Sequence, residues 1–157
     1  MYGGSYGGWL VLKIATSPCG LFVRAGATRN GIGNFPTFFS ALVKSFPWRK
    51  GHREREYIGQ NISQVERERI ISALSPVNPK SELFCKNIYL FTGKKDTRVL
   101  WKSSENFKDE MNKKSGENEV EHHPFPKEGH KIKRHKNLVS LLDETIKFFR
   151  KHSERSD

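Results

Sequence analysis

The stretch Gly3-Gly4-Ser5-Tyr6-Gly7-Gly8 has the spacing G-x-S-x-G, and a largely apolar run follows it. This pattern is typical of a sharp turn from a strand into a helix, which holds a serine hydroxyl out as a nucleophile. We therefore expect a buried helix over residues 6–17 and a candidate nucleophile at Ser5. Only two residues precede the motif, so we expect the strand that should lead into the turn to be missing apart from them.

Helices and strands are predicted to alternate along the rest of the chain. Three short apolar runs, each closed by a glycine or a proline, are predicted to be strands: 21–26, 87–93 and 119–125. Three longer segments are predicted to be helices: 63–74, 101–114 and 136–149. This order indicates an α/β fold in which a mostly parallel sheet carries helices on both faces.

Finer signals concern helix ends and packing. Ser63 with Glu66 three residues later predicts a capping box, and Gly116 suits the end of the helix before it. Residues 34–39 and 46–48 combine aromatic residues with proline and are predicted to form turns. Five apolar residues of the last helix recur at helical spacing and predict one buried stripe: Leu138, Leu141, Leu142, Ile146 and Phe149.

Length and composition set outer limits. The chain has 157 residues, which suffices for one domain with a core but hardly for two. We assign residues 1–152 to one partial domain and 153–157 to a polar C-terminal tail. The formal net charge of +11 favours weak association with anionic partners. Cys19 and Cys85 are too few for a disulfide framework, and neither a secretory signal nor a membrane span is visible, so we expect a cytoplasmic protein.

Two further residues complete a hydrolytic site with Ser5 in the predicted fold. A serine hydroxyl needs an imidazole to take its proton and a carboxylate to orient that imidazole. Asp96 comes soon after the predicted strand 87–93, and His130 follows the predicted strand 119–125. Both side chains should therefore lie at the same edge of the sheet. The order Ser, Asp, His in these contexts favours a serine hydrolase.

These motifs resemble the C-terminal part of the catalytic domain of prolyl-oligopeptidase-type serine peptidases, close to the acylaminoacyl-peptidase and dipeptidyl-peptidase branches. The resemblance spans nearly the whole chain and rests on six groups of residues: Gly-Gly-Ser-Tyr-Gly-Gly at 3–8, Leu21-Phe22, Ser75-Pro76, Thr92-Gly93 with Asp96, Arg98 and Val99, Phe125-Pro126 with Glu128-Gly129-His130, and Ile146-Lys147-Phe148-Phe149. It departs from the family at Leu100 and Ser103, where proline and glutamine are common.

The resemblance implies both a fold and a site. The fold is a partial α/β-hydrolase domain that lacks the strands before the serine. The site is a catalytic triad of Ser5, Asp96 and His130, with the backbone N–H of Tyr6 as an oxyanion donor and no cofactor. The substrate class is a peptide or a small ester.

Relatives of this kind also carry earlier sheet strands, a second oxyanion donor and usually an N-terminal propeller. Loss of one oxyanion contact costs roughly 100- to 1,000-fold in rate. We therefore expect a truncated serine peptidase or hydrolase with little or no independent activity, and a complementary N-terminal segment as a candidate partner. Without the strand before Ser5, residues 21–25 should form an open edge of the sheet.

Other functions remain as alternatives. The basic runs 49–55 and 131–136 suit phosphate contacts, but no recognised nucleic-acid module accompanies them, so nucleic acid is a weaker hypothesis. An inactive remnant is also compatible with the resemblance. A metal site is not expected, because His122 and His123 are adjacent on a predicted strand and should face opposite sides.

Overall fold

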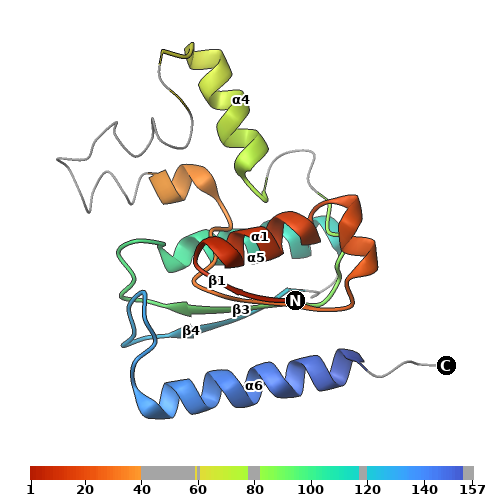
Figure 1. The fold of residues 1–157 in the computed structure, drawn as a ribbon, viewed down its shortest axis with the longest axis vertical. Coiled ribbons are helices and arrows are strands. Elements are labelled where there is room, and N and C mark those ends of the chain that lie inside the picture. The colour runs from red at the N-terminus through yellow and green to blue at the C-terminus, as the bar shows by residue number, and fades with distance from the viewer. Residues whose placement is uncertain (40–58, 60, 78–81, 117–119, 154–157) are drawn as a thin grey trace.

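The computed structural model describes residues 1–39, 59, 61–77, 82–116 and 120–153 (Figure 1). A four-stranded sheet of order β1-β2-β3-β4 lies at its centre, and all three pairings are parallel. The strands are β1 (Tyr2–Gly4), β2 (Gly26–Arg29), β3 (Ile88–Gly93) and β4 (Val120–Phe125). The predicted parallel sheet is confirmed.

Helices cover both faces of this sheet, as predicted. They are α1 (Tyr6–Ala15), α4 (Gln64–Leu74), α5 (Trp101–Ser115) and α6 (His135–Ser153). In Figure 1, α1 and α5 lie on one face, α6 lies on the other, and α4 extends beyond α1 and α5. Ser63 and Glu66 form the predicted capping box, and Gly116 ends α5 with a left-handed backbone conformation.

The predicted strand at 21–26 is wrong. Residues Pro18–Phe22 form a 3-10 helix, η1, and the side chains of Leu21 and Phe22 are 69% and 90% exposed. Proline suits the first turn of such a helix because its missing N–H needs no partner there. The strand begins only at Gly26, and β2 reads Gly-Ala-Thr-Arg. A strand this short with no long apolar side chain carries no hydrophobic pattern, which is why sequence reasoning missed it.

The strand before Ser5 is present in its last residues. Tyr2–Gly4 pair with Ala27–Arg29, and the Ser5 N–H donates to the Arg29 carbonyl oxygen at 2.8 Å. The expectation that residues 21–25 form the outer edge is therefore wrong. β1 occupies that position in the described sheet.

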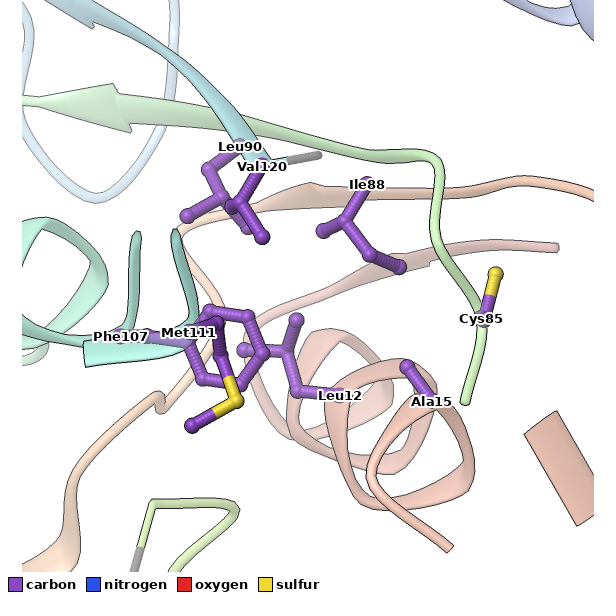
Figure 2. Close-up of a cluster of buried hydrophobic side chains, with 8 residues drawn as sticks. All are labelled: Leu12, Ala15, Cys85, Ile88, Leu90, Phe107, Met111 and Val120. Carbon is purple, nitrogen blue, oxygen red and sulfur yellow. The ribbon is translucent and has the colours of Figure 1, made fainter. Parts of the chain in front are cut away.

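The core has two layers, one on each side of the sheet. Figure 2 shows the layer between the sheet and helices α1 and α5. Its fully buried members are Leu12, Ala15, Cys85, Ile88, Leu90, Phe107, Met111 and Val120. The other layer packs α6 against the sheet through Phe91, Phe125, Leu141 and Phe148, among others.

The predicted stripe on the last helix is only partly correct. Leu141 is buried and Phe149 packs against the core, whereas Leu138, Leu142 and Ile146 are between 40% and 59% exposed. The buried residues Leu141 and Phe148 are seven apart, so the helix touches the sheet along a narrower line than the apolar pattern suggested.

The aromatic segment 34–39 is helical from residue 35, and the Asn34 side chain accepts the Thr37 N–H at 2.9 Å. Phe35, Phe38 and Phe39 are buried beside Trp9. The predicted turn is wrong there, and residues 46–48 lie outside the described residues. Within the described ranges, no helix is both long enough and apolar enough to cross a membrane.

Candidate active site

Ser5 stands at a sharp turn between β1 and α1. Its φ is 54° and its ψ is −116°, a backbone conformation that residues other than glycine rarely adopt. The adjacent Tyr6 is the first residue of α1, so its N–H has no carbonyl one turn earlier within the helix to bind. The serine side chain and one unsatisfied backbone donor therefore project from the same turn.

Two glycines make this turn possible. A Cβ on Gly3 would overlap the carbonyl oxygen of Gly7, and a Cβ on Gly8 would lie 2.7 Å from the Cα of Gly31. Both obstacles are backbone, which cannot move aside as a side chain can. Gly7 differs, because a Cβ there would meet nothing within 4 Å. The spatial requirement is for Gly3 and Gly8.

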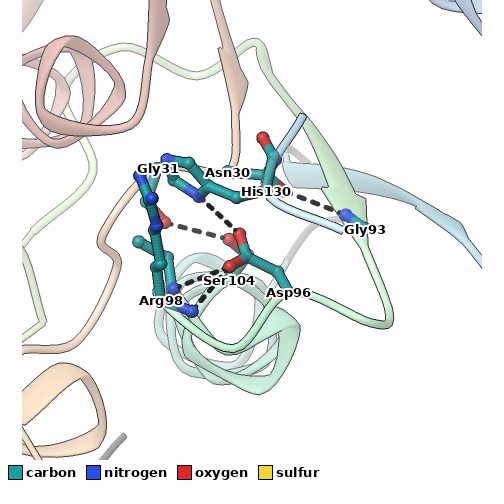
Figure 3. Close-up of polar contacts among 8 residues, drawn as sticks. Asn30, Gly31, Gly93, Asp96, Arg98, Ser104 and His130 are labelled. Carbon is teal, nitrogen blue, oxygen red and sulfur yellow. Dashed lines mark hydrogen bonds and ion pairs between the residues drawn. The ribbon is translucent and has the colours of Figure 1, made fainter. Parts of the chain in front are cut away.

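Asp96 follows β3 and is held from two sides (Figure 3). Its Oδ1 accepts the N–H groups of Arg98 at 2.8 Å and Val99 at 3.0 Å, and its Oδ2 lies 2.7 Å from His130 Nδ1. The Asp96 side chain is fully buried and the His130 side chain is 21% exposed. Because a carboxylate only accepts, Nδ1 is the donor in this contact, and in a neutral imidazole Nε2 would then hold the lone pair. Nε2 is thus the atom available to act as a base.

The structure brings Asp96 and His130 into contact but leaves Ser5 without a direct bond to them. No hydrogen bond joins Ser5 Oγ to His130 among the described residues. The three residues nevertheless lie at the same edge of the sheet, because Ser5 follows β1, Asp96 follows β3 and His130 follows β4. In related reactions such contacts often tighten only when substrate is bound.

Asn30 connects these segments, and sequence reasoning missed it. It directly follows β2, is 1% exposed and has a φ of 50°. Its Oδ1 accepts the Gly93 N–H at 2.9 Å and its Nδ2 donates to the His130 carbonyl oxygen at 2.8 Å. Asn30 therefore fastens the end of β3 and the His130 loop to the end of β2. The one available signal is weak: asparagine tolerates a left-handed conformation better than most residues.

Glu128 fixes the other side of the His130 loop. Its buried carboxylate accepts the N–H groups of Lys133 at 3.0 Å and Arg134 at 3.1 Å and the Asn137 side-chain amide at 2.6 Å. The Lys133 hydrogen bond, followed by those of Asn137 and Arg134, lowers the pKa of Glu128 despite the opposing effect of burial. Glu128 thus ties the loop to the start of α6, which fits a structural role.

Ser103, where the family commonly has glutamine, also has a structural role. Its Oγ is fully buried and accepts the N–H groups of Gly33 at 3.1 Å and Asn34 at 2.9 Å. The serine therefore orders the loop that follows β2 and leads into the helical segment 35–39.

His122 and His123 face opposite sides of β4, as predicted. His122 Nε2 lies 2.7 Å from Thr92 Oγ1 and its ring stacks on Trp101 of α5, whereas His123 Nδ1 lies 2.9 Å from Glu144 Oε2 on α6. Burial, reinforced by nearby cations such as Lys108, lowers the pKa of His122 to about 4. Among the residues that the structure describes, no group of three or more His, Cys, Asp and Glu residues is placed to hold a metal ion.

Of the two basic runs, 49–55 lies outside the described residues. The run 131–136 begins directly after His130 and is exposed except at Ile132.

A family model and several solved structures are similar to this chain. A family model described as the prolyl oligopeptidase family matches residues 1–156. The acylaminoacyl peptidase of Pyrococcus horikoshii is similar in structure, with 21% identity and a TM-score of 0.71 over 96% of this chain and 23% of that chain. An acylaminoacyl peptidase in complex with Z-Gly-Gly-Phe-chloromethyl ketone has 21% identity and a TM-score of 0.73 over 99% of this chain and 24% of that one.

Enzymes of other kinds share the fold. A monoglyceride lipase from Saccharomyces cerevisiae has 17% identity and a TM-score of 0.61 over 97% of this chain and 61% of that chain. Curated proteins give no match. The likeness confirms a partial α/β-hydrolase fold. The chain spans about a quarter of the length of the acylaminoacyl peptidase chains that it matches, namely 23% and 24%.

The glycine requirement gives a first prediction. Gly3→Ala should lower the free energy of unfolding by about 3 kcal/mol, because its Cβ meets backbone that cannot move aside. Gly7→Ala is the matched control inside the same motif and should raise it by about 1 kcal/mol through better helix propensity. Urea unfolding measures both. Equal destabilisation by the two substitutions would contradict the described turn.

A second prediction concerns Asn30. Asn30→Ala should destabilise the protein by about 2 kcal/mol more than Asn61→Ala, because it removes the partners of one buried N–H and one part-buried carbonyl. Asn61 also has a positive φ, of 57°, but is exposed, so it controls for the backbone conformation. Thermal unfolding of both variants tests the difference. Similar losses would mean that only the backbone conformation matters.

The third prediction concerns pH. Glu128→Gln should cost about 2 kcal/mol at pH 7, because two backbone N–H groups lose a charged acceptor. The folded pKa of Glu128 is lowered, so its contribution is complete above the ordinary pKa of about 4.3 and disappears as pH falls through the folded value. Denaturant unfolding should show a smaller difference in the free energy of unfolding between wild type and variant at pH 3 than at pH 7. The exposed Glu110→Gln should show no such convergence; a constant gap for Glu128→Gln would refute the assignment.

Proposed function

The chain belongs to the prolyl oligopeptidase family, and we propose that it carries the nucleophile, acid and base of a serine hydrolase that cleaves peptides or small esters. The observation that carries the proposal is the 2.7 Å contact between Asp96 Oδ2 and His130 Nδ1, at the sheet edge where Ser5 occupies its sharp turn. An incidental contact between a surface aspartate and a loop histidine would not require a buried carboxylate that also accepts two backbone N–H groups.

The proposed reaction is acyl transfer to water. Ser5 Oγ attacks the substrate carbonyl carbon while His130 Nε2 takes the hydroxyl proton, and Asp96 stabilises the imidazolium that results. The Tyr6 N–H stabilises the negative oxygen of the tetrahedral intermediate. His130 then protonates the leaving group, and a water molecule, deprotonated by His130, releases the acyl group from Ser5.

We propose that the chain by itself has little activity. One oxyanion donor, Tyr6 N–H, is identified, and removal of a single such donor in comparable sites costs roughly 100- to 1,000-fold. A complementary N-terminal segment that pairs with the outer edge of β1 would supply a second donor. The chain's span of about a quarter of its relatives supports such a partner.

The cytoplasmic location remains part of the proposal. Cys19 is exposed, Cys85 is buried, and no disulfide joins them in the described structure. Both cysteines are thus compatible with a reducing compartment.

A fluorophosphonate probe tests the proposed chemistry. Ser5 should be labelled slowly, at least about 100-fold more slowly than in a full-length relative. Labelling should disappear in Ser5→Ala and in His130→Ala, because the hydroxyl then has no base. The exposed His135→Ala is the control and should label like the wild type.

Four outcomes would count against this proposal. Labelling of another residue would refute the role of Ser5 as the nucleophile. Equal labelling rates with and without His130 would refute the role of His130 as the base. No labelling of Ser5 over a day would mean that the nucleophile is inactive. A rate equal to that of a full-length relative would instead refute the predicted weakness of the chain alone.

A further inference from the structure

A hollow of about 470 Å³ lies directly beside His130. Its charged lining is mostly cationic: Arg98, Lys127, Lys131, Lys133 and Arg134. All five are exposed at the rim or wall of the hollow. The volume falls within the range of sites that hold small molecules.

The one acidic residue in the lining offsets only one of these five charges. Glu128 is 3% exposed, and its two carboxylate oxygens already accept the Lys133 and Arg134 N–H groups and the Asn137 amide. Its ion pair with Arg134 is long, at 3.9 Å. The hollow therefore presents an excess of positive charge toward whatever occupies it, with five cations against one carboxylate.

The position of His130 links this charge to the reaction. The imidazole forms part of the wall, and its Nδ1 is committed to Asp96. Figure 3 shows that Asp96 contacts both Arg98 and His130: Arg98 donates through its backbone N–H and His130 through its Nδ1. Ser5 is not part of the lining, so His130 is the residue that links the hollow to the reaction: a substrate that uses His130 as the base would come close to the cationic wall.

We propose that this hollow is a subsite for an anionic group of the substrate, so that the enzyme prefers peptides or esters bearing a carboxylate near the scissile bond. The inference rests on the proposed hydrolase function, which does not by itself specify charge. Each exposed ion pair is weak by itself, but several cations around one anion give a preference of about 10-fold over a neutral analogue.

The same residues account for part of the basic run that suggested nucleic acid. Lys131, Lys133 and Arg134 converge on one hollow beside His130 instead of forming an extended line. A polyanion needs a row of phosphate contacts along its backbone. The arrangement favours a single anionic group over a nucleic-acid strand.

The test compares two small ligands that differ in charge and little in shape, N-acetyl-glutamate amide and N-acetyl-glutamine amide. Binding to the full chain is followed by the NMR shifts of the Gly129 and His130 amides at pH 7 and low salt. The glutamate compound should bind about 10-fold more tightly, and added salt should remove most of the difference. Equal affinities would overturn the proposal.

Matched double variants separate the hollow from the overall charge of +11. Lys127→Gln with Lys131→Gln should abolish the preference, whereas Lys113→Gln with Lys151→Gln removes the same charge elsewhere and should retain it. Equal loss in both variants would show a nonspecific charge effect and overturn the proposal. Tight binding of a single-stranded DNA 20-mer without any glutamate preference would also overturn it, in favour of nucleic acid.

Ser5 labelling distinguishes this inference from the proposed function. Labelling of Ser5 in a protein without the glutamate preference would refute the subsite alone. A glutamate preference in a protein whose Ser5 does not react would support an anion site there and refute the hydrolase.

Discussion

The close approach of backbone to backbone around Gly3 and Gly8 is the constraint on which the site depends. α1 can start immediately after β1 only because no side chain separates Gly3 from Gly7 or Gly8 from Gly31. Ser5, between these glycines, has a positive φ of 54°, and α1 begins at the next residue. Ordinary packing offsets the local strain at Ser5, because Leu12 and Ala15 of α1 are buried in the core on the same face of the sheet as α5.

Asn30 extends this arrangement across the sheet. The Ser5 N–H bonds to Arg29, and the next residue, Asn30, bonds to both Gly93 and the His130 carbonyl. The segments that carry Ser5, Asp96 and His130 are thus joined through one pair of neighbouring residues. An uncharged amide can occupy this buried position because both its oxygen and its nitrogen have hydrogen-bond partners.

The sequence predicted the elements that have strong local chemistry. The serine turn, the capping box at Ser63 and the strand 87–93 each follow from residue types with few alternatives, and all three are present. β2 is not predicted at its true position because pairing with β1 and β3, and not an apolar pattern in Gly-Ala-Thr-Arg, makes this segment a strand. The Asp96–His130 contact was anticipated from the order of strands and loops. The role of Asn30 was not, because two hydrogen bonds to distant backbone leave no trace in a sequence.

The order of the strands in the sheet is also their order along the chain. During synthesis, each new strand of the described sheet can therefore add to the strand made just before it, and none has to be inserted between two finished neighbours. The histidine emerges after the fourth strand, on the order of ten seconds after the serine at ordinary translation rates. A nascent chain consequently displays its serine turn well before the base that would activate it exists.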